Sequence, residues 1–415
     1  MRQSGSVSSH PEPDGLVTAD GPLVADANGC PIGVHFGSEG FNEQFHAALQ
    51  VLRDRAPIAA DLRLENTYFI SRYADVWQLL QDWQVYSSAQ GVAGTAGSKN
   101  RLLPLEADPP EHTQWRRRLN PFLSRDRMRA KVDAIRRIAD ELMEPLLTGD
   151  EVDLVAGFAA ALPARVFFAE IMGLPVDQAA QCVEIVERAV FSHDPAASAA
   201  GFADLEGFVR PLAAAAVERP ETDDIVSAAA HTVIDGERAP LSDVVSVLVM
   251  LVLGGLETTS AVLGGILRQL AIEPGLIAEL RSEPTLRDSA TEESLRMFTP
   301  TTYLRRTVTC PITVHGKELH PGDKIELSYV SANFDETEFP DPDRFDADRR
   351  PNRHLAFGVG MHRCIGSHLA RVVLHTALSL VVERVDRIDV LTEAPQYHSV
   401  PTRGLVSLPA RLTRR

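Results

Sequence analysis

The 415-residue chain has only four cysteines, a deficit of basic residues and no apolar run long enough to span a bilayer. The cysteines are far apart and form no CxxC pair, which argues against a zinc cluster or a disulfide framework. With 41 Lys and Arg against 57 Asp and Glu, the net charge of −16 lacks the basic footprint of a nucleic-acid-binding protein. The longest apolar run, Val247 to Leu256, is about half of a membrane span, and the N-terminus lacks the apolar core of a secretory signal. These absences predict a cytoplasmic protein that binds neither nucleic acid nor membrane.

The remaining composition is that of a globular protein, with 44% hydrophobic and 24% charged residues. Residues 1–35 are rich in Pro, Gly, Ser and Asp and are predicted to form a flexible arm ahead of one domain over 36–415. Apolar residues at helical spacing predict helices at 41–54, 73–83, 111–119, 126–147, 153–172, 176–192, 201–218, 222–233, 242–271, 288–298 and 366–383. Alternation predicts a hairpin in 62–73 and strands in 302–330 and near the C-terminus. The expected fold class is mainly α with a small β region in a single domain.

A glycine-rich segment, FGVGMHRCIG at 357–366, delivers Cys364 to the start of a helix, where a thiolate gains from the helix dipole. Its glycines let the backbone approach a large flat ligand, beside which Phe357 and Gly358 are expected to pack. A lone cysteine is normally a small buried hydrophobe, and the other three cysteines are expected to be of this kind. Around Cys364, however, the segment resembles the haem-binding loop of the cytochrome P-450 family, FGxGxHxCxG. The resemblance implies that Cys364 is the axial thiolate ligand of haem iron.

A second feature lies in the long apolar helix predicted at 242–271. Helical side chains lean towards positions i−3 and i−4, so Thr258 should face a notch beside Gly254 and Gly255, large enough for a diatomic ligand or a water. Glu257 is costly to bury without a purpose and points about 100° away, so a water should link the two side chains. The alternative is a tolerated glycine pair with a threonine that bonds back to a carbonyl. The stretch matches the family's (A/G)-G-x-(D/E)-T signature, which implies that Glu257 and Thr258 are a catalytic acid–alcohol pair.

A third feature is Glu293 and Arg296, which share a helix face at spacing i, i+3. On a surface such a pair contributes little to stability. The position between the long helix and the cysteine segment matches the family's ExxR motif. The resemblance implies a buried network completed by Arg344 from the segment PDRF, with a role in folding and haem retention.

A fourth feature concerns the two haem propionates, which need charge-assisted hydrogen-bond donors. His112 and Arg116 follow a proline-containing helix start at spacing i, i+4. The resemblance implies that both bind propionates, together with Arg306 and His362. A docking patch for an acidic ferredoxin is predicted from other basic residues: Arg117, Arg118, Arg353 and Arg363.

The resemblance covers residues 40–410 and implies the cytochrome P-450 fold, haem b as cofactor and O₂ as co-substrate. The implied enzyme is a monooxygenase that takes electrons from NAD(P)H through ferredoxin reductase and ferredoxin, and inserts one oxygen atom into a small, largely apolar or aromatic substrate. The predicted pocket residues are Val247, Met250, Gly254, Thr301, Thr302, Leu304 and Val400. Two alternatives are a peroxide-using member of the family and a haem-binding sensor or carrier without turnover. The acid–alcohol pair argues against both.

Overall fold

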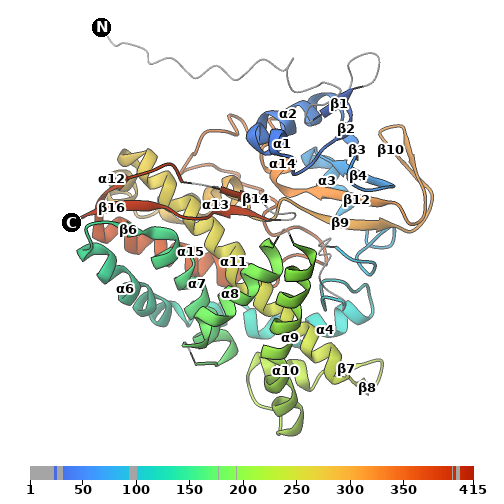
Figure 1. Ribbon diagram of the computed structural model, residues 1–415, viewed down its shortest axis with the longest axis horizontal. Coiled ribbons are helices and arrows are strands. Elements are labelled where there is room, and N and C mark those ends of the chain that lie inside the picture. The colour runs from blue at the N-terminus through green and yellow to red at the C-terminus, as the bar shows by residue number, and fades with distance from the viewer. Residues whose placement is uncertain are drawn as a thin grey trace.

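A computed structural model describes residues 23–25, 31–92, 101–175, 177–192, 194–394, 396–398 and 402–415. Helices make up the larger part, and a mixed sheet lies to one side of them (Figure 1). The expected class, mainly α with a small β region, is confirmed. The predicted pocket residue Val400 lies outside the described residues.

The main sheet has seven strands in the order β1-β2-β3-β4-β12-β9-β5. The hairpin predicted over 62–73 is only partly right: β4 falls inside that range, but its partner β3 lies before it, with Ile58 paired to Ile70. Strand β12 runs parallel to β4 and antiparallel to β9, so the predicted strands after residue 302 complete this sheet. The strands are β1 (Leu23–Ala25), β2 (Pro31–Val34), β3 (Ile58–Asp61), β4 (Thr67–Ile70), β5 (Tyr86–Ser87), β9 (Tyr303–Val308) and β12 (Lys324–Ser328).

Two of these strands fall inside the segment that was expected to be an arm. β1 and β2 pair antiparallel, and β2 pairs parallel with β3 through Gly33 and Ala60. Neither strand shows a clear alternating pattern, because each is only three or four residues long. Pairing with the existing sheet, rather than local sequence, therefore decides their conformation.

The remaining strands form small two- and three-stranded sheets. They are β6 (Val152–Asp153), β7 (Val233–Ile234), β8 (Glu237–Arg238), β10 (Ile312–Val314), β11 (Lys317–Leu319), β13 (Val385–Val390), β14 (Gln396–His398), β15 (Arg403–Leu405) and β16 (Pro409–Arg414). The C-terminal strands were predicted, and β16 joins β13 to β6.

Most helices lie where the apolar spacing predicts them. They are α1 (Glu39–Glu43), α2 (Phe45–Arg55), α3 (Tyr73–Leu79), α4 (Glu111–Leu119), α5 (Arg125–Arg129), α6 (Val132–Thr148), α7 (Ala161–Val166), α8 (Gln178–Phe191), α9 (Pro195–Glu218), α10 (Ile225–Ala230), α11 (Leu241–Ile272), α12 (Pro274–Ser282), α13 (Leu286–Met297), α14 (Tyr329–Asn333) and α15 (Ser367–Arg384). Two π-helical segments, Val155–Ala159 and Phe167–Met172, flank α7. Helices α12 and α14 were not predicted.

Helix α11 crosses the middle of the helical part (Figure 1). Its residues are apolar almost all round, so the chain gains from burying every face of it. Close packing also depends on glycine: a Cβ at Gly265 would lie 2.3 Å from the ring of Phe298, just after α13. Helix α11 therefore packs closely against the residue that follows α13.

Two helical segments, Val155–Met172 and Leu241–Ile272, are long and apolar enough to cross a membrane by length and composition. Within the protein, 61% and 56% of their most apolar windows are buried. The core helix of a globular protein passes the same test. The sequence interpretation considered only the uninterrupted apolar run and so did not identify them.

Candidate active site

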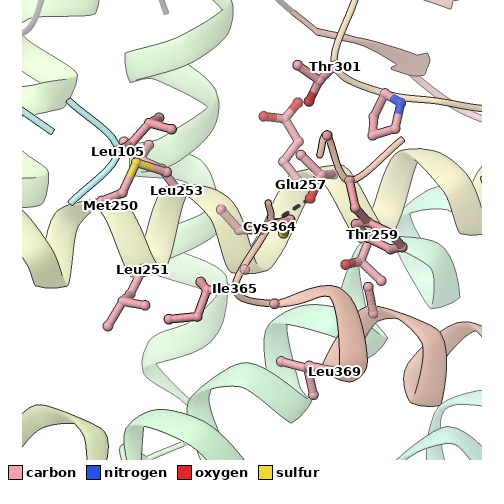
Figure 2. Close-up of a pocket in the computed structure, with 18 of the residues that line it drawn as sticks. Leu105, Met250, Leu251, Leu253, Glu257, Thr259, Thr301, Cys364, Ile365 and Leu369 are labelled. Carbon is pink, nitrogen blue, oxygen red and sulfur yellow. Dashed lines mark hydrogen bonds between the residues drawn. The ribbon is translucent and has the colours of Figure 1, made fainter. Parts of the chain in front are cut away.

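A cavity of about 300 Å³ lies between α11 and the loop that leads into α15 (Figure 2). Its walls are mainly aliphatic and aromatic. Leu105, Met250 and Leu253 gather at one end, while Ile365 and Leu369 line the side nearer α15 (Figure 2). The polar groups that reach it come from separate elements, including Glu257 and Thr258 of α11, Thr301, Thr402, His112, Arg116, Tyr329, His362 and Cys364. Most of its surface is therefore suited to an apolar ligand.

The glycine-rich loop places Cys364 on the wall of this cavity. Gly358 and Gly360 have φ values of 61° and 73°, a conformation that glycine adopts without the penalty of a Cβ. A Cβ at Gly360 would lie 2.9 Å from the carbonyl oxygen of Leu80, so that position also needs close backbone approach. The Cys364 N–H donates to the carbonyl of Phe357 over 2.8 Å and closes the loop. The thiol is left accessible from the cavity, two residues before the N-cap of α15.

Surrounding protein atoms raise the pKa of the Cys364 thiol by desolvation. The backbone N–H of Gly366 and the guanidinium groups of Arg116 and Arg363 act in the opposite direction. Among the described residues, no group of three or more His, Cys, Asp or Glu side chains is arranged to hold a metal ion. The Cys364 thiol is thus a lone sulfur on the cavity wall with the guanidinium groups of Arg116 and Arg363 nearby.

Facing this loop, α11 presents Gly254, Glu257 and Thr258 to the cavity. The Thr258 hydroxyl donates to the Gly254 carbonyl over 3.2 Å, which is the back-bonded geometry considered as an alternative from the sequence. The notch is smaller than predicted. A Cβ at Gly255 would lie 2.5 Å from the Phe167 ring, so Phe167 fills the space beside that glycine.

Gly254 has only Met250 Cε near its Cβ position, at 3.5 Å, and is exposed. The space beside Thr258 is therefore open at Gly254 and filled at Gly255. Glu257 extends from α11 towards Thr301, away from the loop of Cys364 (Figure 2). This direction agrees with the angle expected between consecutive helical residues.

A buried histidine, His112, and a half-buried one, His362, meet at the cavity wall. The ring centroids of His112 and His362 are 4.2 Å apart, although 250 positions separate them in sequence. Both ring nitrogens of His112 and Nε2 of His362 are buried and have no hydrogen-bond partner among the described residues. Desolvation, reinforced by nearby arginines, lowers the pKa of His112 to about 4 and that of His362 to about 2. Buried polar atoms of this kind normally have partners, so this wall is suited to a ligand that carries hydrogen-bonding groups.

Two arginines predicted for the same ligand lie close by. Arg116 Nη2 donates to the Arg363 carbonyl over 2.9 Å, and its Nε donates to Asn120 Oδ1 over 2.8 Å. Arg306 is 2% exposed and does not line the cavity; its charge acts on His362 and on the Tyr329 hydroxyl. The structure thus brings Arg116 to the cavity wall and leaves Arg306 behind Tyr329 and His362.

Phe357 and Gly358 both line the cavity beside Cys364. The guanidinium carbon of Arg371 lies 4.6 Å from the centroid of the Phe357 ring. Gly358 has the Tyr329 hydroxyl 3.7 Å from its Cβ position. These contacts hold the ring and the glycine on the side of the cavity that faces α11.

The ExxR pair is fully buried, but its arginine partner differs from the prediction. Glu293 accepts from Arg296 Nε and Nη2, both over 2.8 Å, and from Arg349 Nε over 3.0 Å. The prediction of Arg344 is wrong: its side chain is 68% exposed and pairs with Asp346 at 3.3 Å. Only the Arg344 carbonyl joins the network, where it accepts from Arg349 over 3.3 Å. The chain turns between the two arginines, and no local pattern distinguishes which one is directed inward.

Four of the predicted pocket residues line the cavity: Met250, Gly254, Thr301 and Leu304. Val247 does not. It is fully buried one turn earlier on α11, where the neighbouring Ser246 bonds to the backbone of residues 101 and 103. Thr302 does not line it either, because successive residues of an extended chain point to opposite sides and Thr301 takes the inward position. Phe167 and Thr402 line the cavity and were missed, since each reaches it only through tertiary packing.

The four arginines predicted as a docking patch are not equivalent. Arg118 pairs with Glu221, and Arg353 pairs with Glu338 at 2.8 Å. Arg117 and Arg363 are exposed. The charges of Arg125, Arg363 and Arg371 act together to lower the pKa of His368 after desolvation, so a cationic surface lies around Arg363.

Comparison with known proteins adds independent evidence. Residues 222–389 match the family model described as Cytochrome P450. The chain is 30% identical over 372 residues to a steroid C26-monooxygenase of Mycolicibacterium smegmatis, covering 88% of this chain and 90% of that protein. It is 32% identical over 384 residues to a linalool 8-monooxygenase of Pseudomonas putida, covering 88% and 94%. A Mycobacterium marinum cytochrome P450 in complex with pseudoionone superposes with a TM-score of 0.82 at 26% identity, covering 89% and 95%.

Proposed function

The chain belongs to the cytochrome P450 family of monooxygenases, and we propose that it inserts one oxygen atom of O₂ into a small, largely apolar or aromatic substrate. The observation that carries this proposal is the placement of Cys364 across an apolar cavity from Glu257 and Thr258. A sulfur ligand, an acid–alcohol pair and a dry substrate pocket are the parts that such chemistry needs in one place.

The residues at the cavity fit haem, which the family implies, and we assign haem b. Cys364 would hold the haem iron through its sulfur, and the porphyrin would provide the further ligands that the described residues around it do not. His112, Arg116 and His362 offer unpaired or cationic donors for two propionates, with Arg306 adding charge from behind. When bound, haem with a thiolate ligand supplies the O₂ activation.

The chain's own side chains would position substrate and supply protons. Thr258 holds a proton on Oγ1, which at present is donated to the Gly254 carbonyl. Glu257, one residue earlier, is the ionisable group from which that proton can be replaced through water. Leu105, Met250 and Leu253 exclude bulk water from the same space.

An apolar substrate is supported by the lining and by the relatives. The two curated relatives are named for oxidation of a steroid and of linalool, and the solved structure contains pseudoionone. Thr301 and Thr402 are the neutral hydroxyl groups at the end of the cavity nearer the sheet. They would orient a substrate through a single oxygen atom while the rest of it contacts aliphatic side chains.

Electrons are proposed to come from NAD(P)H through ferredoxin reductase and ferredoxin. The cationic surface around Arg363, with Arg125 and Arg371, is suited to an acidic protein partner. A cytoplasmic location is proposed on the free state of the described cysteines, Cys182, Cys310 and Cys364.

Reconstitution tests the function directly. With surrogate ferredoxin and reductase, we expect NADPH consumption to be accelerated by substrate and to match the product formed. A peroxide-using enzyme would make product from hydrogen peroxide alone and gain nothing from NADPH. A sensor or carrier would bind haem and ligand but form no product under either condition.

Replacing Thr258 by alanine should leave haem binding intact and divert electrons to hydrogen peroxide. The change removes the hydroxyl together with the γ-methyl group, and loss of the hydroxyl is expected to lower product per NADPH about tenfold. Product, peroxide and NADPH are measured in the same reaction. Thr258→Ser keeps the hydroxyl and is the control. Equal coupling in wild type and Thr258→Ala would contradict a role for this side chain in proton delivery.

Replacing Arg116 by alanine should weaken haem retention. A charge-assisted hydrogen bond contributes about 1.5–3 kcal/mol, so haem should transfer to an acceptor apoprotein roughly ten times faster or more. Arg117→Ala is the matched control, because that adjacent side chain is exposed and points elsewhere on α4. If both variants retain haem like wild type, Arg116 does not bind a propionate.

A further inference from the structure

A second cavity, also of about 300 Å³, lies on another side of α11. It is enclosed by the π-helical segment before α7 and by α8, α11 and β15. The lining residues are Val155, Ala160, Val183, Val186, Glu187, Leu256, Glu257, Ser260, Leu405 and Val406. We call it the side cavity, to distinguish it from the main cavity that contains Cys364.

Glu257 lines both cavities. Its neighbours on α11 are divided between them: Gly254 and Thr258 line the main cavity, whereas Leu256 and Ser260 line the side cavity. Because each helical residue is rotated by about 100° from the next, a side chain between two such faces can serve either space. Glu257 is therefore the ionisable group at the boundary between them.

The outer end of the side cavity reaches solvent. Glu187 lines the cavity and is also exposed on α8, and Val406 is 55% exposed. Partial burial, followed by the charge of Glu184 one turn away, raises the pKa of Glu187. A carboxyl group with a raised pKa holds its proton at higher pH than an ordinary glutamate. Glu187 thus joins bulk water to the interior at a position where it can carry a proton.

The size and polarity of the side cavity suit water. At about 30 Å³ per molecule in the liquid, its volume has room for several waters. Buried water needs polar partners, and Glu187, Glu257 and the Ser260 hydroxyl provide these along its length. Valine, leucine and alanine side chains form the remaining wall, so water in the cavity would bond to these three polar residues.

We propose that the side cavity is the proton entrance of this enzyme, with Glu187 as the outer relay residue and Glu257 as the inner one. The inference rests on the proposed function, because reduction of one oxygen atom of O₂ to water consumes two protons and two electrons. The electrons come from the redox partner, and only protons pass through the side cavity. Glu187 regains each proton from solvent and Glu257 regains each one through water, so neither carboxyl group is consumed.

A crystal structure of the haem-loaded protein tests the path without turnover. We expect ordered waters that connect the carboxyl groups of Glu187 and Glu257 past Ser260. In Val183→Phe, whose larger side chain should fill the side cavity, we expect these waters to be displaced while the main cavity is unchanged. A dry side cavity in the wild-type protein would overturn the proposal.

Kinetics with Glu187→Gln provides the second test, and Glu218→Gln is its matched control. Glu218 is exposed at the end of α9 and does not line the side cavity. In Glu187→Gln we expect product per NADPH to fall, peroxide to rise and the solvent deuterium isotope effect on product formation to increase about twofold. The absorption spectrum and the substrate-induced spin shift should match wild type. Behaviour identical to Glu218→Gln would overturn the role of Glu187.

The two tests separate failure of this inference from failure of the proposed function. If the wild-type protein makes no product from NADPH and O₂, the proposed function fails and the proton entrance fails with it. If the wild-type protein turns over normally but neither Glu187→Gln nor Val183→Phe changes coupling or the isotope effect, the proton entrance is contradicted and the proposed function stands.

Discussion

Cys364→Ser is expected to abolish monooxygenation and to remove the strongly red-shifted Soret band of the reduced carbon monoxide complex. A thiolate donates electron density that favours cleavage of the O–O bond, and a serine hydroxyl in the same place does not. We expect product formation to fall by at least about a thousandfold, which corresponds to roughly 4 kcal/mol in activation free energy. The spectrum and the rate are measured on the same preparation.

The control for this variant is Cys310→Ser. Cys310 is also a free and exposed cysteine, but it does not line the main cavity. It should keep the red-shifted band and full activity, which excludes a general effect of removing a thiol. A wild-type spectrum typical of histidine-ligated haem, or a Cys364→Ser protein that retains the red-shifted band, would show that Cys364 is not the ligand.

Glu293→Gln should lower the free energy of unfolding by about 3–5 kcal/mol, as expected when one partner of a buried ion network loses its charge. Glu293 and Arg296 are completely buried, and Arg349 is 8% exposed, so the two guanidinium groups would be left without a counter-charge. Haem content should fall together with stability, because the segment that carries Arg349 leads into the loop of Cys364. Chemical denaturation and haem quantification measure the two effects.

The choice between two arginines makes this prediction specific. Arg349→Ala should destabilise the protein strongly, since its side chain bonds to Glu293 and to the carbonyls of Pro340 and Asp341. Arg344→Ala should change stability by no more than about 0.5 kcal/mol, the usual range for an exposed site. If Arg344→Ala destabilised the protein more than Arg349→Ala, Arg344 would be the residue that completes the network.

Much of the helical framework was predictable because its signal is local. Helix α11 begins and ends within one residue of the range expected from its apolar residues, and α15 does the same. The hairpin of β3 and β4 was predicted only in part, because the alternation over 62–73 includes β4 but not β3. In contrast, β1 and β2 are too short for a pattern and take their conformation from the sheet that they join.

The residues predicted to carry the chemistry of the site were also recognisable from local sequence. Cys364 in its glycine-rich loop, and Glu257 beside Thr258, are recognisable because the residues that define each motif are neighbours in the chain. Their local geometry, a tight loop before one helix and adjacent positions on another, depends on few residues. Sequence alone was therefore sufficient to select three residues that the structure brings to one cavity.

Only the tertiary structure decided how these motifs are completed. Phe167 fills the space beside Gly255, and Arg349 replaces Arg344 at Glu293. The contact of His112 with His362 and the position of Glu257 between two cavities likewise join segments far apart in sequence. Each depends on which side chain fills a given space once α11, α15 and the sheet have packed together. That choice is made by steric fit and by the cost of burying unpaired polar groups, and neither has a local pattern in the sequence.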